Sequence, residues 1–466
     1  MPRQRPNAAL EALLIEAGWS AADLARAVNA LGAAQGLTLR YGRSSIAHWL
    51  AGSRPRSPVP ELAAGAFSRR TGRLVTAQDT GLTPVPHHHG PPLLTVPPGK
   101  VNAMRYLTGL CREDIDPVRR ARLTRTPYRL TAQPSWRPDT TPAPGPGAGL
   151  VPVQARYGRT ATVADARALR ETAQAFAALA DCHGGAPVRL PLAVYLADHA
   201  LRLLAAPARE TVHRELLTAT AQLTHLLARM TADTGHPGLA QQYYTAALHL
   251  SREAGDRRLY AITLRAMSLQ ALTMGHPHHA HRLTETALTT AGPAADEATR
   301  AFLLTQHALT SARTRQPRQA LHTLTTAETL HDQATSPPGI FTAYPRAGLD
   351  YQRAQTLTAL GHHTDAIQAL RDSLAHRPAD ERRARALTHA RLAESLLHTG
   401  HLEEACTHWH HFLTHYPHLH SHPTDQALTH LQHTLTPHHH NPHAHTLLQH
   451  AHTLTTHTSP RTPGTG

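Results

Sequence analysis

The pattern of apolar and polar positions predicts an all-α protein with three regions. In residues 1–80, apolar side chains recur at helical spacing between short turns that contain Gly and Arg. Residues 81–160 hold runs such as TPVPHHHGPP and TTPAPGPGAG, in which frequent Pro prevents regular structure. We interpret them as a Pro/Gly/Arg-rich linker with a candidate short helix within 100–130. Helices separated by Gly, His and Pro are predicted over 161–457, and a disordered tail over 458–466.

Four helices are predicted in the first region. The first ends at Gly18, and Ser20 is a suitable N-cap for the second, with Asp23 three residues further on. A fourth helix is expected from 60 to about 70. The residues expected to face the core from the first two helices are Leu10, Leu13, Leu14, Leu24, Ala25 and Val28.

The third helix is predicted from the sequence RSSIAHWLAG at residues 43–52. Ile46, Trp49 and Leu50 recur at i, i+3 and i+4, so they share the face that packs on the core. Gly52 closes the helix. The residues left on or near its exposed side are Arg43, Ser44, Ser45, Ala47 and His48.

The C-terminal region repeats a Gly-to-Ala spacing. A turn residue is followed five positions later by Ala, and the turns are separated by 40, 40, 46 and 39 residues. These pairs are Gly235 with Ala240, Gly275 with Ala280, Arg315 with Ala320, Gly361 with Ala366, and Gly400 with Ala405. Gly allows the first helix to end in a left-handed conformation, and Ala allows the second to pack closely against it.

This regular period predicts a stack of helical hairpins, that is, an α-solenoid. The spacing resembles that of tetratricopeptide repeats, with helices slightly longer than in the usual unit of about 34 residues. Solenoids of this kind present surfaces that bind peptides or partner helices, so a peptide or protein effector is expected here. The alternative architecture is an irregular helical bundle.

Charge is distributed unevenly along the chain. The net charge is +14 overall, with +5 in residues 1–80, +7 in 81–160 and +2 in the remainder. A basic end joined to a nearly neutral scaffold is typical of a protein that binds a polyanion such as DNA. The three cysteines are far apart and form no disulfide framework, which favours a cytoplasmic location. We find no signal peptide and no apolar run long enough to span a membrane.

The N-terminal residues resemble the lambda-repressor-like (XRE) helix-turn-helix fold, whose third helix often places Ile, Trp or Tyr, and Gly as Ile46, Trp49 and Gly52 stand here. Two features depart from that pattern: the connection NALGAAQGLTLRYGR is long, and Leu50 replaces a frequent Glu. Together with DARALRETAQAFAALADCHGG and GLAQQYYTAALHLSREAGDRRLYAITLRAMSLQAL, the motif RYGRSSIAHWLAGSRPR resembles a group of actinomycete regulators with tetratricopeptide-like C-terminal regions. Such regulators generally act in development or secondary metabolism.

In this fold the N-terminus of the third helix enters the major groove of double-stranded DNA. We therefore expect base contacts from Arg43, Ser44, Ser45 and His48. Arg40, Arg54 and Arg56 flank the helix and are expected to contact phosphates. A homodimer is expected, because proteins of this fold gain affinity by placing two such helices one turn of DNA apart. The alternative for each residue is a solvated surface side chain.

Other chemistry is poorly supported. Of the 40 histidines, 18 lie from residue 401 onward, but neither Cys nor a carboxylate completes a tetrahedral metal site beside them. The sequence has no Gly-rich phosphate loop, no carboxylates paired at helical spacing and no GxSxG motif. We therefore expect no enzyme activity, no cofactor and no metal. The leading interpretation is a DNA-binding transcription regulator that associates with the nucleoid. The alternative is a scaffold that assembles other proteins through its repeats.

Overall fold

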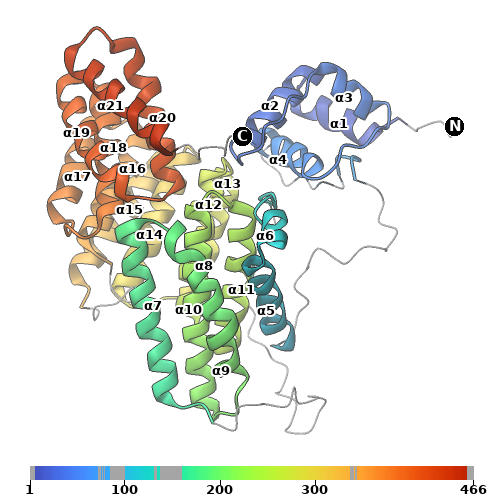
Figure 1. Cartoon of the computed structure of the whole chain (residues 1–466), viewed down its shortest axis with the longest axis vertical. Helices are drawn as coiled ribbons and strands as arrows, with labels where there is room; N and C mark the ends of the chain where they lie inside the picture. Colours follow the sequence, from blue (N-terminus) through green and yellow to red (C-terminus); the bar gives the residue numbers. More distant parts are fainter. Residues whose placement is uncertain are drawn as a thin grey trace, which may run out of the picture. The chain divides into compact units, whose positions relative to one another are not determined.

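The computed structural model describes residues 6–71, 75, 77, 79–83, 100–130, 134–136, 160–335, 341 and 344–458. Helices joined by turns and loops make up these ranges and no strand occurs among them, which confirms the predicted all-α fold (Figure 1). Residues 459–466 of the predicted tail lie outside the described residues, as do 84–99 and 137–159 of the predicted linker. The chain divides into two compact units, Met1–Ala166 with Ala193–Thr290, and Arg167–Leu192 with Ala291–Gly466.

Four helices form the N-terminal domain of the first unit: α1 (Ala8–Ala17), α2 (Ala21–Ala33), α3 (Arg43–Leu50) and α4 (Val59–Thr71). Gly18 ends α1 with a left-handed φ of 62°. The Ser20 hydroxyl accepts a hydrogen bond from the Asp23 backbone N–H at 3.3 Å, and the Asp23 carboxylate accepts one from the Ser20 N–H at 2.9 Å. This reciprocal capping box starts α2 where the sequence predicts it.

The core of this domain joins all four helices. Leu10, Leu24, Ile46 and Phe67 are fully buried and belong to one apolar cluster. The same cluster contains Leu82, which is also fully buried. The segment after α4 therefore returns to the N-terminal core, which extends slightly beyond residue 80.

Two helices, α5 (Lys100–Ile115) and α6 (Pro117–Leu123), lie in the stretch for which the sequence predicts one short helix in a linker. The segment packs on α11 (Pro237–Ala254). The Tyr243 hydroxyl donates a hydrogen bond to the buried Asp114 carboxylate at 2.7 Å. Gln241 and Arg129 exchange two further hydrogen bonds, of 3.0 and 2.6 Å. A Cβ on Gly238 would lie 2.0 Å from the Thr126 carbonyl oxygen, so only glycine allows this close approach.

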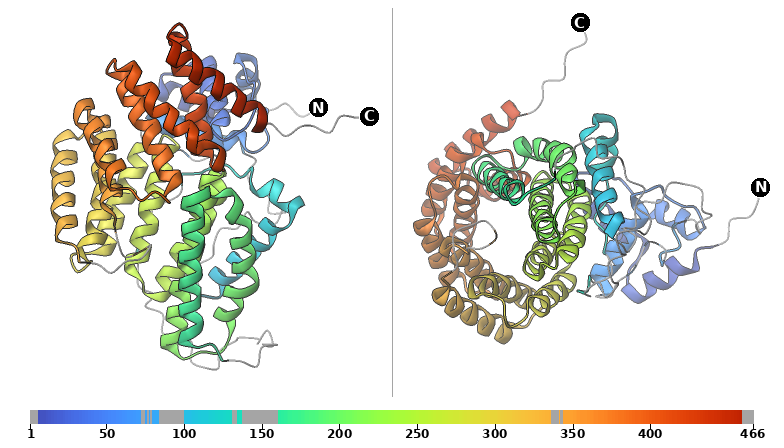
Figure 2. Two further views of the ribbon diagram at one scale, coloured as in Figure 1. Left: turned by 60° about the vertical axis from the view of Figure 1, so that its left-hand side comes forward. Right: turned by 90° about the horizontal axis from the view of Figure 1, so that it is seen from below.

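Antiparallel helices follow as hairpins in the first unit. α10 (Glu210–Asp233) pairs with α11, and α12 (Arg257–Thr273) is followed by α13 (Pro277–Ala291) (Figure 2). The π-helical turn η1 (Leu196–Ala200) and α9 (Leu201–Ala205) also belong to this unit, whereas most of α7 (Val163–His183) and of α8 (Ala186–Tyr195) belongs to the second unit.

The second unit continues the hairpin pattern. Besides most of α7 and α8, its helices are α14 (Glu297–Arg313), α15 (Pro317–Gln333), α16 (Arg346–Leu360), α17 (His363–His376), α18 (Arg382–His398), α19 (Leu402–His415), η2 (Tyr416–His418), α20 (His422–Leu435), η3 (Thr436–His438) and α21 (Pro442–Thr458). Trp409 and Phe412 of α19 are fully buried in its C-terminal core.

The repeated turns have the backbone that the Gly-to-Ala spacing predicts. Their φ values are 80° at Gly235, 76° at Gly275, 63° at Arg315, 84° at Gly361 and 87° at Gly400. The alanines five positions further on, Ala240, Ala280, Ala320, Ala366 and Ala405, all have 0% exposure. The small alanine side chain thus allows the second helix of each hairpin to pack closely against the first.

Candidate nucleic-acid interface

The long connection between α2 and α3 is held in place by one side chain. The Asn29 side-chain N–H donates to the Tyr41 carbonyl oxygen at 2.8 Å, and the Asn29 side-chain oxygen accepts from the Tyr41 backbone N–H at 2.9 Å. Gly32 leaves room for Leu39, whose Cδ1 would lie 2.5 Å from a Cβ at that position. The connection is longer than a tight helix-turn-helix turn, yet these contacts fix the position at which α3 begins.

One face of α3 is locked into the core and the other is open to solvent. Ile46 and Trp49 are buried, and the Tyr41 ring lies edge-on to Trp49 at 5.1 Å. Arg43 and Ser44 are exposed, as are Ala47 and His48. Leu50, which the sequence places on the core face, is partly buried against the same apolar cluster.

Ser45 differs from the other predicted base-reading residues. It is only partly exposed, and its hydroxyl accepts a hydrogen bond from the Gly42 backbone N–H at 3.4 Å. The hydroxyl is therefore engaged in starting α3. Ser45 is consequently less available for a base than Arg43, Ser44 or His48.

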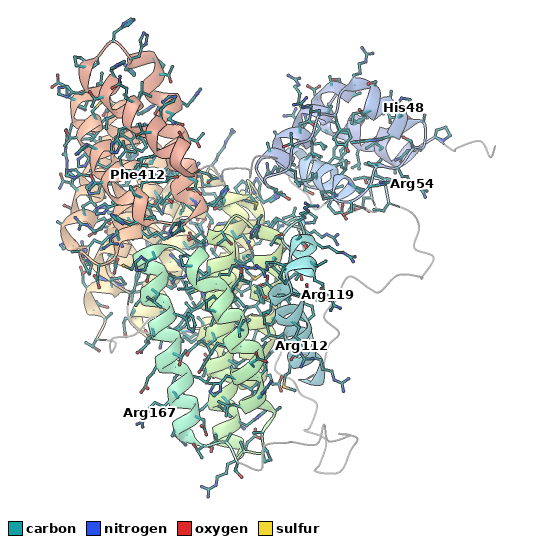
Figure 3. The ribbon with its side chains drawn as sticks, viewed as in Figure 1. His48, Arg54, Arg112, Arg119, Arg167 and Phe412 are labelled. Carbon is teal, nitrogen blue, oxygen red and sulfur yellow. The ribbon has the colours of Figure 1, made fainter. Side chains whose placement is uncertain are left out.

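The three predicted phosphate-contacting residues are exposed and border α3 on both sides. Arg40 precedes the helix, and Arg54 and Arg56 follow it. Figure 3 shows His48 and Arg54 at the surface of the N-terminal domain. Residues 40–56 contain four Arg and no acidic residue, so this segment carries a net positive charge.

The acidic side chains nearest in sequence are engaged elsewhere. Hydrogen bonds from Ser20, together with Arg26, lower the pKa of Asp23 to about 2. Glu61 on α4 accepts a hydrogen bond from Arg129 at 2.8 Å, and only 11% of the Glu61 side chain is exposed. Both acids therefore have a hydrogen-bond partner outside α3.

Residues beyond the predicted site connect α4 with the repeats of the first unit. Arg69 lies against the α12–α13 turn, where a Cβ on Gly275 would come within 2.9 Å of its guanidinium carbon. Arg69 is exposed as a whole, but partial desolvation beside this turn lowers its pKa to about 10. Next in the turn, His276 stacks on Tyr128 with ring centroids 5.8 Å apart. The sequence gives no periodic signal for these contacts, because they join segments far apart in the chain.

Histidines of the second unit gather between α18 and α19, an arrangement that the sequence does not predict. His389 Nδ1 lies 3.1 Å from His408 Nδ1, and its ring stacks on those of His411 and His415 at 4.9 and 6.3 Å. Among the described residues, no group of three or more His, Cys, Asp or Glu has a geometry suited to a metal ion. His389, His408, His411 and His415 are called the histidine cluster below.

Comparisons with known proteins match the two ends of the chain to different family models. Residues 221–335 and 347–436 match the family model described as tetratrico peptide repeat, which confirms the predicted repeats. Such repeats support interaction with other proteins. Residues 10–83 match the model described as SP15 N-terminal domain, and not a model of an XRE helix-turn-helix family. A comparison with curated proteins finds no match. Within the described ranges, no helix is both long and apolar enough to cross a membrane.

Proposed function

We propose that this protein is a transcription regulator that reads double-stranded DNA with α3, and that its repeats bind a peptide or protein effector and assemble a homodimer. The observation that carries the proposal is the division of α3 into two faces. Ile46 and Trp49 fix one face to the core, while Arg43, Ser44 and His48 remain exposed in a stretch without acids. A helix held rigidly with exposed cationic and hydroxyl side chains suits the major groove.

Contacts of α4 link the repeats of the first unit to the N-terminal domain. Arg69 and Glu61 of α4 contact the α12–α13 turn and Arg129, respectively. A partner that shifts this hairpin would therefore also disturb α4, whose residues Leu62 and Phe67 pack in the same core as α3. The proposed regulator has no catalytic role, and it acts in the cytoplasm, at the nucleoid when bound to DNA.

The second candidate is a scaffold that assembles other proteins without binding a DNA sequence. The observation that favours it is the tetratricopeptide match, since these repeats function in protein–protein contact. Under this alternative, the exposed residues of α3 would contact a protein instead of DNA.

Selection of duplexes from a random library by the full-length protein distinguishes the two candidates. We expect enrichment of a defined sequence, and binding of that sequence that weakens steeply with salt. Recovery of unenriched DNA, with no shift of any duplex at low salt, would contradict the proposal and favour the scaffold.

A further inference from the structure

A row of exposed arginines lies along α5 and α6 and just beyond the end of α6, outside the predicted base-reading site. Its members, called here the α5–α6 arginine row, are Arg105, Arg112, Arg119, Arg122 and Arg125. Figure 3 shows Arg112 on α5 and Arg119 on α6. Residues 117–125 hold four Arg and no acid.

Arg105 and Arg112 lie on the side of α5 opposite the side that packs on α11. Tyr106, Leu107, Leu110 and Asp114 are buried, with Tyr106 and Asp114 directed to Gln242 and Tyr243 of α11. Arg105 and Arg112 are seven residues apart, so they project from the same side of the helix about 10 Å apart along its axis. Between them stands Gly109, where an added Cβ would meet nothing within 4 Å. The outward face is therefore open between its charges.

Four of the five arginines of this row have no ion pair among the described residues. Arg105, Arg112, Arg122 and Arg125 have no acidic partner within 4.0 Å among the described residues, and Arg119 has only a distant one, Asp116 at 3.7 Å. Many arginines of the repeats are different, because they pair with an acid. Examples are Arg202 with Asp198, Arg214 with Glu210, Arg353 with Glu328 and Arg391 with Glu394.

The row is also held in place before any ligand arrives. The Tyr243–Asp114 and Gln241–Arg129 hydrogen bonds fix the segment to α11. Arg120 donates to the carbonyl oxygens of Asp114 and Ile115 at 2.8 and 3.0 Å, which fixes the start of α6 against the end of α5. Spaced, unneutralised guanidinium groups on an anchored surface suit a ligand with regularly spaced negative charges.

We propose that the α5–α6 arginine row is a second DNA contact, which binds the phosphate backbone of the duplex whose bases α3 reads. The inference rests on the proposed function, and it adds a surface that supplies affinity without reading sequence. Double-stranded DNA is the partner because the Glu61–Arg129 ion pair joins this segment to α4 of the N-terminal domain. One duplex would then contact both surfaces.

The test compares two triple variants of the full-length protein. Arg112→Ala/Arg119→Ala/Arg122→Ala removes three charges from the row. Arg167→Ala/Arg202→Ala/Arg214→Ala removes three from exposed positions of other helices. Fluorescence anisotropy with a labelled duplex of arbitrary sequence gives the affinity at several salt concentrations. We expect the row variant to bind at least about 10-fold more weakly and its log–log salt slope to be shallower by about 2 to 3. The control variant should keep most of the wild-type slope and affinity.

Three results would overturn the proposal. The first is a row variant that binds the duplex with wild-type affinity. The second is an equal loss of duplex affinity in both variants, which would show only an effect of net charge. The third is loss of binding to vesicles with anionic phosphatidylglycerol while duplex binding is unchanged, which would assign the row to a membrane surface. Selection of a duplex sequence, and its dependence on Arg43, test the proposed function separately, so the two failures are distinguishable. Unchanged thermal melting verifies that both variants fold.

Discussion

The side-chain amide of Asn29 on α2 satisfies both backbone groups of Tyr41, donating to its carbonyl oxygen at 2.8 Å and accepting from its N–H at 2.9 Å. Tyr41 in turn lies edge-on to Trp49, the buried anchor of α3. The position of α3 therefore depends on a polar contact twelve residues apart in the sequence.

Asn29→Ala should lower the free energy of unfolding by about 1–3 kcal/mol, because it leaves both Tyr41 backbone groups without their partner. It should also weaken DNA binding, although Asn29 is not a predicted DNA contact. Urea denaturation and a DNA titration measure the two effects. Gln35→Ala removes an amide from the same connection and should change neither. Equal stability of Asn29→Ala and the wild type would mean that the connection does not depend on this contact.

Arg315→Gly should stabilise the protein by about 1 kcal/mol. Arg315 is a non-glycine residue at a φ of 63°, where a Cβ crowds the backbone. The reciprocal change, Gly361→Ala, meets no atom within 4 Å, so its φ of 84° alone should make it destabilising by a similar amount. Thermal melting of both variants measures the effect. A lower melting temperature for Arg315→Gly would show that the arginine side chain contributes more than its backbone costs.

Ala280→Glu should disrupt the α12–α13 hairpin. Ala280 has 0% exposure, and its carbonyl oxygen accepts a hydrogen bond from the Ser268 hydroxyl at 2.8 Å. A buried, unpaired carboxylate in that space should cost more than about 3 kcal/mol. His278→Glu places the same charge at an exposed position of α13 and should be tolerated.

Because α4 contacts this hairpin, Ala280→Glu should also weaken DNA binding without removing a DNA contact. Light scattering alongside the DNA titration would show whether the proposed homodimer is lost at the same time. If Ala280→Glu bound DNA as tightly as the wild type, the repeats would have no part in DNA binding.

The stability of the second unit should fall as the pH falls below about 6.5. Burial, with the nearby charges of His408, His411, Arg385 and His415, lowers the pKa of His389 to about 3. An unfolded histidine titrates near 6.5, so between about pH 6.5 and 3 the unfolded chain binds a proton that the folded chain does not. Acidification through this window therefore favours unfolding, and the stabilisation is complete above it.

His389→Gln should reduce this pH dependence, because the variant no longer has the buried imidazole. His225 and His276 have pKa values lowered to about 3 chiefly by burial, and they should give the first unit a pH dependence of its own that this variant keeps. The measurement is the melting temperature between pH 7.5 and 5, with the exposed His433→Gln as control. Identical pH profiles for the wild type and His389→Gln would exclude the histidine cluster as the source.

Local sequence signals predicted the helices well, but they did not predict contacts between residues far apart in the sequence. The Ser20–Asp23 capping box and the Gly-to-Ala spacing are written within a few residues, so their structures could be inferred directly. The packing of Asp114 on Tyr243, which joins residues 129 positions apart, leaves no periodic trace. The Pro-rich surroundings of α5 therefore suggested a linker for a segment that packs firmly.

The same limit applies to the candidate site. The apolar spacing of Ile46 and Trp49 located α3 and its exposed face, and burial of both residues agrees with it. The partial burial of Ser45 depends on its hydrogen bond to Gly42, which residue spacing does not reveal. The clustering of His389 with three histidines of α19 depends on how two helices cross, which composition does not reveal.

The most direct test of base reading by α3 is the affinity of Arg43→Ala and Arg56→Ala for the selected duplex and for a scrambled duplex. We predict that Arg43→Ala loses about 1–3 kcal/mol on the selected duplex and relaxes base preference at one position. Arg56→Ala should weaken both duplexes alike and make the salt dependence shallower by about 1. Unchanged affinity of Arg43→Ala for the selected duplex, with its base preference intact, would contradict the assignment of α3 as the reading helix.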